Sequence, residues 1–376
     1  MKILINANVH MGGAIQVAQS LICALQTHHE HEYSIVCSHE VMKNLGDVSR
    51  FPPFMKFVVY PHLNFLDKCR RLFGIDHFMD KQVKNFVSEA VLSIFGPTYW
   101  KPSVLHVCGY AKPQYIYIES PFFQRLSMPG KIKLWIKKRL HLHSFRRDAH
   151  VFITETEEVS RRLRKLFPGS TVYTVTNTYN QIFNHPELQE EIKLPEFNGI
   201  SLLTISALYP HKNLEIIFSV GEYLLKHYPN FKFRFIITLS AKELGLSSAN
   251  QYPWILPIGK VSVSQCPSLY RQCNFAFLPT LLECFSANYP EAMKTERPML
   301  TSDLPFARDI CQDAAEYFDP LDPVSIGDVI YNLANDKEKQ KRIISSGQQR
   351  LQWFCTPEER TSKYLKIIQK ECKINK

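Results

Sequence analysis

Short apolar segments alternate with amphipathic stretches along this chain of 376 residues. The segments are rich in Val, Ile, Leu and Phe, which is typical of the buried strands of parallel sheets. A first series of predicted strands comprises residues 2–7, 33–37, 56–59, 90–95, 104–107, 149–154 and 171–176. A second series comprises residues 200–206, 231–237, 254–257, 274–278 and 298–302. Helical patterns lie between these strands, so we expect an α/β fold with two parallel sheets.

A polar stretch separates the two series of strands. Residues 189–198 read QEEIKLPEFN and contain Pro195, which is the composition of a linker. We therefore expect an N-terminal domain at residues 1–196 and a C-terminal domain at residues 197–355. Open parallel sheets bind ligands beyond the carboxyl ends of their strands, so we expect functional residues in the turns that lead from strands to helices.

The composition is that of an ordinary globular protein, with 45% hydrophobic and 21% charged residues. It excludes disordered and collagen-like classes. The ten cysteines include no C-x-x-C pair and no cluster of Cys and His with the spacing of metal ligands. We therefore expect free thiols and no structural zinc.

Residues 3–29 contain no charged side chain, which could suggest a membrane anchor. Polar residues such as Asn6 and Asn8 interrupt this stretch, and it fits a strand, a turn at Gly12 and Gly13, and a helix. Since the chain has no other long apolar run, we expect a cytoplasmic location.

The formal net charge of +10 favours an anionic partner. Residues 121–147 hold eight basic and no acidic side chains, interleaved with apolar residues. This pattern predicts a basic amphipathic helix that lies on an anionic membrane surface. The alternative is a solvated face packed on its own domain. Nucleic-acid binding is not expected, because no DNA- or RNA-binding motif accompanies the stretch.

The turn after the predicted strand 274–278 carries the sequence TLLECFSANYPEAM, at residues 280–293. Glu283 would lie in this loop, and Glu291 would lie in the first turns of a helix that begins near Ala287, with both carboxylates facing the ligand. Carboxylates accept hydrogen bonds from sugar hydroxyls, and the free N–H groups of a helix start suit a diphosphate. The alternative is that Glu283 caps the helix and Glu291 is solvated.

The Glu-x7-Glu pattern of Glu283 and Glu291, followed by Ala-Met and with Phe285 two residues after the first Glu, resembles the donor-site half of retaining glycosyltransferases of family 4. Further matching segments are SALYPHKNL (206–214), GKV (259–261), LYRQC (269–273), Ser302-Asp303 and DAAEYFDP (313–320). In the N-terminal half, the matching segments are MGG (11–13), DAHVFIT (148–154) and TNTYNQIF (176–183). The resemblance extends across the chain and implies the GT-B fold, in which two Rossmann-like domains face each other across a cleft.

The resemblance also implies roles for individual residues. Lys212 would reach the diphosphate of a nucleotide sugar, and the catalytic residues would be Glu283, Lys212 and His106. The donor would also contact Ser206, Phe285, Ser286, Ala287 and Glu291. The transferred sugar and the acceptor would contact His10, Gly12, Gly13 and Gln16. A C-terminal helix at residues 356–376 would return to complete the N-terminal domain.

Several positions depart from the family pattern. Ser206 and Ala207 stand where many members have Gly-Arg, so no arginine assists Lys212 there. Cys284, Ser286 and Asn288 stand where Gly, Gly and Pro are usual. His106 lies within an apparent strand, so a buried structural histidine and a site residue both fit the pattern, and His10 is a second candidate.

We expect a retaining glycosyltransferase that moves a hexose from a nucleotide diphosphate sugar to a hydroxyl of a lipid-linked glycan. The glycan would belong to a bacterial surface polysaccharide, such as lipopolysaccharide or capsule, and the enzyme would be peripheral at the inner face of the cytoplasmic membrane. No metal or other cofactor is expected, because no Asp-x-Asp motif occurs and Lys212 would neutralise the diphosphate. The rival interpretations are a GT-B epimerase or hydrolase of sugar nucleotides and a catalytically silent GT-B binding protein.

Overall fold

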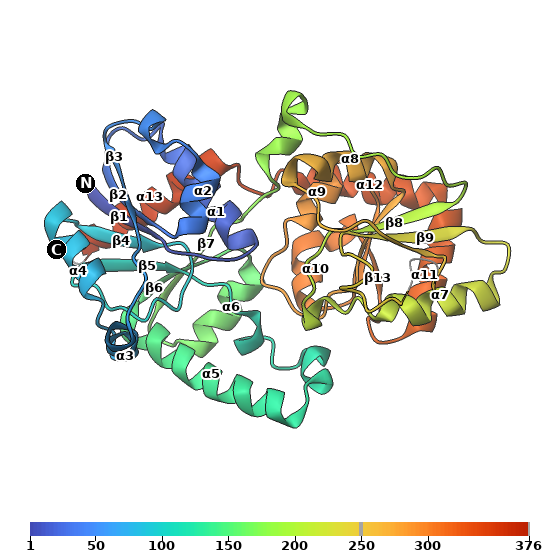
Figure 1. Ribbon diagram of the computed structural model, residues 1–376, viewed down its shortest axis with the longest axis horizontal. Helices are drawn as coiled ribbons and strands as arrows, with labels where there is room; N and C mark the ends of the chain where they lie inside the picture. The colour runs from blue at the N-terminus through green and yellow to red at the C-terminus, as the bar shows by residue number, and fades with distance from the viewer. Residues whose placement is uncertain (248–250, 375–376) are drawn as a thin grey trace. The chain divides into compact units, whose positions relative to one another are not determined.

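The chain forms two compact units, which a computed structural model describes over residues 1–247 and 251–374. The N-terminal unit comprises residues 1–116, residues 126–177 and the C-terminal segment from Cys355. The C-terminal unit comprises residues 117–125 and 178–354. Each unit has its own parallel sheet and its own hydrophobic core (Figure 1).

A sheet of seven parallel strands, in the order β3-β2-β1-β4-β5-β6-β7, forms the centre of the N-terminal unit. Its strands are β1 Lys2–Ala7, β2 Glu32–Cys37, β3 Met55–Val59, β4 Ala90–Ser93, β5 Leu105–Gly109, β6 Val151–Thr154 and β7 Thr171–Thr174. The register places Ile5 of β1 between Ile35 of β2 and Leu92 of β4. All three side chains are buried, because helices cover both faces of the sheet.

The helices of the N-terminal unit cover the two faces of this sheet. They are α1 Gly13–Leu25, α2 His39–Leu45, α3 Phe65–Leu72, α4 His77–Phe86, α5 Met128–Asp148, α6 Glu157–Leu166 and α13 Pro357–Ile374, with the short 3-10 helices η1 Val48–Arg50 and η2 Pro113–Tyr115. Helices α1 and α13 contribute Leu21 and Ile368 to the main core on one face. Helix α4 contributes Met79 and Val83 to a smaller core on the other face.

The sheet of the C-terminal unit has six parallel strands in the order β10-β9-β8-β11-β12-β13. They are β8 Ile200–Thr204, β9 Phe233–Ile237, β10 Ile255–Pro257, β11 Phe275–Leu278, β12 Met299–Ser302 and β13 Glu316–Phe318. Phenylalanine rings run across the sheet, with ring centroids 5.2 Å apart for Phe235 and Phe277 and 5.4 Å apart for Phe277 and Phe318. This aromatic row forms the middle of the core.

The helices of the C-terminal unit connect these strands. They are α7 Ile216–His227, α8 Cys266–Gln272, α9 Asn288–Lys294, α10 Pro305–Cys311, α11 Pro323–Asn335 and α12 Lys337–Leu351. Its 3-10 helices are η3 Pro121–Arg125, η4 Gln181–Asn184, η5 Pro186–Leu188, η6 Pro210–Lys212, η7 Val263–Gln265 and η8 Gln312–Ala314.

The predicted fold class is confirmed, because both units are α/β folds with parallel sheets. Every strand predicted from an apolar segment is present, with ends that differ by a few residues. The apolar pattern misses β13, an edge strand of three residues in which only Phe318 is buried.

The boundary between the units differs from the one expected at residue 196. Residues 178–196 belong to the C-terminal unit, where the expected linker packs against helix α8. The backbone N–H of Ile192 donates to Ser268 Oγ (3.2 Å), and Arg271 forms an ion pair with Glu191 (2.6 Å). Polar composition predicts exposure of this stretch, but these hydrogen bonds give it a fixed place on one unit.

The end of the chain belongs to the N-terminal unit. The backbone N–H of Cys355 donates to Thr176 Oγ1 (2.8 Å), directly at the unit boundary. The buried Arg360 of α13 donates to Ser20 Oγ of α1 (2.5 Å) and to the side chain of Asn177. These bonds hold the start of α13 on α1.

Candidate functional site

The loop that follows β8 carries Lys212 at the end of η6. The next residue, Asn213, is completely buried and adopts a left-handed conformation with φ of 57°. Its Nδ2 donates to the carbonyl of Pro320 (2.8 Å). Asparagine tolerates this conformation better than most residues, so the anchor fixes the backbone next to Lys212.

Lys212 forms an ion pair with Glu283, which lies in the loop after β11. The two side chains are only 18% and 12% exposed. Thr280 Oγ1 also lies 3.3 Å from Glu283 Oε1. Two predicted site residues from strands that are neighbours in the sheet therefore meet at the carboxyl ends of those strands.

The backbone of His211 joins the same two loops. Its carbonyl accepts hydrogen bonds from the N–H of Leu281 (2.7 Å) and from Thr280 Oγ1 (3.1 Å). Burial lowers the pKa of the His211 imidazole, and the charge of Lys212 lowers it further, against the opposing effect of Glu283. The His211 imidazole is therefore neutral, and the positive charge beside it is that of Lys212.

A narrow pocket of about 10 Å³ lies between the loops, which is the room that one water molecule needs. Asn288 Nδ2 closes one side by donating to the carbonyl of Ile205 (2.7 Å). The pocket is lined by polar side chains of Ser206, Lys212, Thr280, Ser286 and Asn288. Three predicted donor residues, Ser206, Lys212 and Ser286, thus lie together, although the pocket itself is too small for a nucleotide sugar.

Glu291 lies apart from this group, on the buried side of α9. Its side chain is 6% exposed and accepts a long hydrogen bond from Tyr270 Oη (3.4 Å). Burial raises the pKa of its carboxyl to about 7. The expectation that both glutamates face the ligand is wrong for this structure, because the first turn of α9 directs Glu291 into the core.

Phe285 and Ala287 lie on the segment between Glu283 and α9. The ring of Phe285 packs against that of Phe354, with centroids 6.0 Å apart. Ala287 is the residue before α9 and carries no side-chain hydrogen bond that caps the helix. Neither residue lines the pocket.

The glycine loop of the N-terminal unit lies at the carboxyl end of β1. Gly12 has φ of 52°, and a side chain added at Gly12 or Gly13 would meet nothing within 4 Å. A ligand could therefore approach this backbone closely. Gln16 lies partly exposed on α1, and the exposed His10 is bonded to Glu40 (3.0 Å).

His106 does not fit the catalytic role expected for it. It is buried within β5, where Nδ1 donates to the carbonyl of Asp148 (2.7 Å) and Nε2 lies 2.8 Å from Ser93 Oγ. Burial lowers the pKa of this imidazole. Because both ring nitrogens are occupied by the protein, the geometry makes His106 a structural residue of the sheet.

Residues 117–125 are the part of the site that the sequence does not predict. This segment follows β5 and precedes α5, yet it packs on the C-terminal unit. The buried Ser120 donates from Oγ to the carbonyl of Leu281 (2.7 Å). Arg125 forms an ion pair with Glu215, and the rings of Phe122 and His211 meet at 6.3 Å. Residues 117–125, the bracing segment, therefore contact both the loop after β8 and the loop after β11.

The described residues hold neither a metal-binding cluster nor a membrane-spanning helix. Over residues 1–247 and 251–374 no group of three or more His, Cys, Asp and Glu side chains is arranged to hold a metal ion. Within the same ranges no helix is both long and apolar enough to cross a bilayer. All ten cysteines are free thiols.

Comparison with known proteins gives a family match over part of the chain. Residues 187–350, just under half of the chain, match the family model of glycosyl transferases group 1. A comparison with curated protein sequences gives no match.

Solved structures resemble the chain over nearly its whole length. A glycosyltransferase from Rickettsia africae has a TM-score of 0.69 at 12% identity, covering 100% of this chain and 99% of that one. Sucrose-phosphate synthase from Thermosynechococcus elongatus has a TM-score of 0.70 at 13% identity, covering 98% of each chain. Anabaena HepE in complex with UDP and glucose has a TM-score of 0.64 at 13% identity, covering 98% of this chain and 100% of that one. The fold of this chain is the GT-B fold of glycosyltransferases.

The burial of Glu291 predicts a specific pH dependence of stability. Its folded-state pKa of about 7 exceeds the ordinary value of 4.5, so the folded state holds the proton more tightly than the unfolded state. The free energy of unfolding should therefore fall as pH rises from about 4.5 to about 7, by up to about 3 kcal/mol. Glu291→Gln removes this loss, so the variant should be more stable than the parent at pH 8 and similar to it at pH 4.5.

Urea unfolding at a series of pH values measures this difference. Glu222→Gln, an exposed position on α7, is the control and should leave the pH profile unchanged. Identical pH profiles for Glu291→Gln and the parent protein would show that Glu291 is not the titrating group.

If the bracing segment stabilises the two loops, removing the Ser120 hydroxyl should increase their local opening. Ser120→Ala deletes the hydrogen bond to Leu281, a loss of about 1 kcal/mol. Amide hydrogen exchange should then accelerate in residues 209–213 and 280–286. Ser262→Ala is the control, because its hydroxyl bonds only within its own turn, to Ser264 (2.7 Å). Unchanged exchange in both loops would contradict the bracing role.

Proposed function

We propose that this protein is a retaining glycosyltransferase that moves a hexose from a nucleotide diphosphate sugar to a hydroxyl of a lipid-linked glycan. The glycan would be a precursor of a bacterial surface polysaccharide, and the enzyme would act at the inner face of the cytoplasmic membrane. One observation carries the proposal: Lys212 and Glu283 pair at the carboxyl ends of neighbouring strands, inside the region that matches glycosyl transferases group 1.

In this proposal Lys212 neutralises the diphosphate of the donor. The bond between the sugar's anomeric carbon and the phosphate oxygen breaks, and the acceptor oxygen bonds to the same face of that carbon. The acceptor's proton passes to an oxygen of the departing diphosphate. Stabilising the charge that develops on this leaving group is the main contribution of the protein.

In this scheme Glu283 changes its partner when the donor binds. Without donor it holds Lys212, and with donor its carboxylate is free to accept hydrogen bonds from sugar hydroxyls. Ala207 leaves Lys212 without an assisting arginine, so the backbone of residues 285–287 supplies the remaining donors to the diphosphate. No metal is required in this scheme, since the positive charge comes from Lys212.

The acceptor side of the proposal rests on the N-terminal unit and on helix α5. Gly12 and Gly13 leave open space beside the backbone where the acceptor would lie. Helix α5 carries exposed Ile132, Trp135 and Ile136 between its lysines. This arrangement suits the headgroup region of an anionic bilayer, where a lipid-linked acceptor would be found.

A panel of nucleotide sugars separates this proposal from its rivals. Thermal unfolding with UDP, GDP, ADP and dTDP sugars should show one class that raises the melting temperature, since ligand binding stabilises the folded state. Nucleotide release that depends on added glycan indicates transfer, whereas release without glycan indicates a hydrolase. The absence of any stabilising nucleotide sugar would contradict the proposal and favour a binding protein without activity.

The catalytic assignment predicts the effect of two substitutions. Lys212→Ala and Glu283→Gln should each lower kcat/KM for transfer by at least about tenfold, a loss of roughly 1.4 kcal/mol of transition-state stabilisation. The control is Lys226→Ala, which removes an exposed lysine from α7 of the same unit and should leave transfer unchanged. Normal kinetics in both site variants would rule out this donor site.

The membrane assignment predicts a salt-dependent association. Replacing Lys133, Lys137 and Lys138 of α5 with Gln should weaken binding to phosphatidylglycerol vesicles by at least about tenfold, because each lysine near such a surface contributes about 1 kcal/mol. The matched control replaces the exposed Lys226, Lys232 and Lys260 of the C-terminal unit, which changes the net charge equally. Vesicle sedimentation at low and high salt measures both, and equal losses would show that only net charge matters.

A further inference from the structure

Helix α3 has an unusual surface for a helix of a globular unit. None of its residues is buried. Phe65 and Leu66 are 79% and 64% exposed, and Leu72 and the following Phe73 are 50% and 76% exposed. These positions recur at the helical spacing of one face, so together they form a continuous apolar stripe that points away from the unit.

Basic side chains flank this stripe on both sides. Lys68 follows one edge of the stripe and Arg70 follows the other, at the positions that helical spacing places beside it. Helix α5 also exposes apolar residues among basic ones: Ile132, Trp135, Ile136 and Leu140 are exposed, and the guanidinium of Arg139 lies over the Trp135 ring, 5.0 Å from its centroid. Long basic side chains beside an apolar stripe can reach phosphate groups while the stripe enters the headgroup layer.

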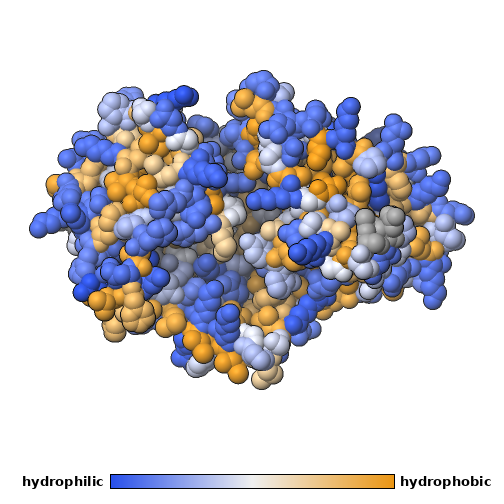
Figure 2. All heavy atoms as spheres, viewed as in Figure 1, coloured by the Kyte–Doolittle hydropathy of each residue, from blue (hydrophilic) through white to orange (hydrophobic). Residues whose placement is uncertain are grey.

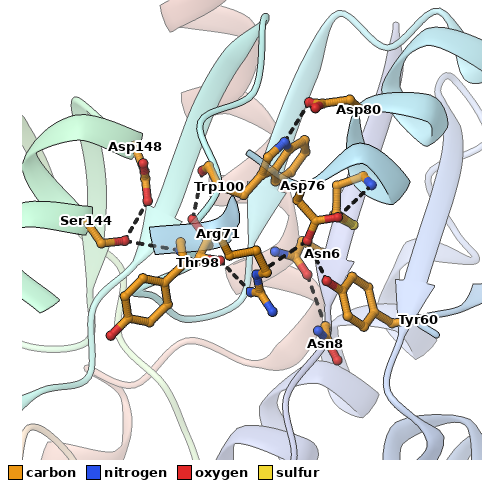
Figure 3. A network of polar contacts seen from close by, with 12 residues as sticks. Asn6, Asn8, Tyr60, Arg71, Asp76, Asp80, Thr98, Trp100, Ser144 and Asp148 are labelled. Carbon is orange, nitrogen blue, oxygen red and sulfur yellow. Dashed lines mark hydrogen bonds and ion pairs between the residues drawn. The ribbon is translucent and has the colours of Figure 1, made fainter. Parts of the chain in front are cut away.

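Polar anchors, rather than apolar packing, hold α3 in place. Arg71 on its inner face donates from Nη2 to the carbonyl of Thr98 (2.6 Å), and its Nε lies 3.5 Å from Asp76 Oδ2. The buried Asp76 also accepts from Tyr60 Oη (2.5 Å). Figure 3 shows Arg71, Thr98, Asp76 and Tyr60 in this network. The inner face is therefore fixed in orientation while the apolar face stays outside.

Helices α3 and α5 are joined within the same unit. Arg147, near the end of α5, donates from Nη1 to the carbonyl of Leu72 (2.7 Å), and its guanidinium lies against Gly74. In the view of Figure 2, hydrophobic residues gather along the lower edge of the N-terminal unit, where Figure 1 places α3 and α5. Arg147 therefore links the C-terminal end of α5 to the end of α3.

We propose that the outer face of α3 is a second membrane-contact surface, which inserts Phe65, Leu66 and Phe73 into the headgroup layer of an anionic bilayer beside α5. This inference rests on the membrane association in the proposed function and names the element that supplies its apolar anchorage. Charge complementarity favours a bilayer over a protein partner, because Asp67, the only acidic residue of α3, is paired with Arg70 (2.9 Å) and every other charged residue of the helix is basic.

Contact of α3 with a bilayer would bring the carboxyl end of the N-terminal sheet, where the acceptor is proposed to bind, close to the membrane. Asp67 and Arg71 on the inner face of α3 line a cavity of about 210 Å³. Pro61, His62 and Leu63, which follow the carboxyl end of β3, line the same cavity. A helix seated in the headgroup layer would hold this end of the parallel sheet next to the lipid, where the hydroxyl of a lipid-linked acceptor arrives.

Depth-dependent fluorescence tests the contact directly. In a Trp135→Phe background, Phe73→Trp places a reporter on the apolar end of α3, and Leu225→Trp places a control on an exposed position of α7 in the other unit. With equimolar vesicles of phosphatidylglycerol and brominated phosphatidylcholine, emission of the Phe73→Trp protein should be quenched and that of the Leu225→Trp protein should not. Equal quenching in the two proteins would overturn the proposal.

Vesicle partitioning gives a second measurement that needs no donor or acceptor. Phe65→Ser with Phe73→Ser should weaken partitioning into phosphatidylglycerol vesicles by at least about tenfold at unchanged net charge. Leu225→Ser with Val324→Ser, a pair of exposed positions in the C-terminal unit, should change it less than twofold.

Two further outcomes distinguish the alternatives. If analytical ultracentrifugation without vesicles shows that the α3 variant abolishes a dimer of the parent protein, a second copy covers this face and the proposal is wrong. If neither nucleotide binding nor transfer is found while the α3 variant still loses vesicle binding, the proposed function fails and the membrane surface stands. Circular dichroism melting of each variant confirms that it is folded.

Discussion

The ion pair between Lys212 and Glu283 is the constraint on which the proposed chemistry depends. Both side chains are largely shielded from water, and charges in such places are costly unless they are paired. Each therefore fixes the other, and the carbonyl of His211 ties the same two loops through the backbone. In the proposed scheme an anionic donor group takes the place of Glu283 as the partner of Lys212.

Two glutamates of one sequence pattern occupy opposite environments in the C-terminal unit. Glu283 stays in a loop beside a cation, whereas Glu291 is enclosed by α9 and Tyr270, and burial raises its pKa to about 7. The same side chain is thus an ionised partner at one position and a carboxyl held partly protonated at the other. Environment rather than residue type decides which of them is paired with a cation.

In the N-terminal unit, the residues that form the hydrophobic core differ from those on the exposed apolar face of α3. Its core consists of strand and helix residues such as Ile5 and Leu21 and includes no residue of α3. Arg71 and Asp76 secure α3 by polar bonds that leave the apolar side of the helix free. Because this apolar side is already exposed, a partner can contact it without any part of the unit unfolding.

The amino-acid sequence by itself determined the strands, because runs of Val, Ile, Leu and Phe bury themselves wherever a parallel sheet forms. A resemblance to known glycosyltransferases singled out Lys212 and Glu283, which the structure pairs beyond the ends of β8 and β11. Only the tertiary structure decided that His106 and Glu291 are buried, that residues 189–198 pack on α8, and that residues 117–125 join the C-terminal unit. These outcomes depend on partners from distant parts of the chain, such as Asp148, Tyr270 and Leu281, which no local pattern specifies.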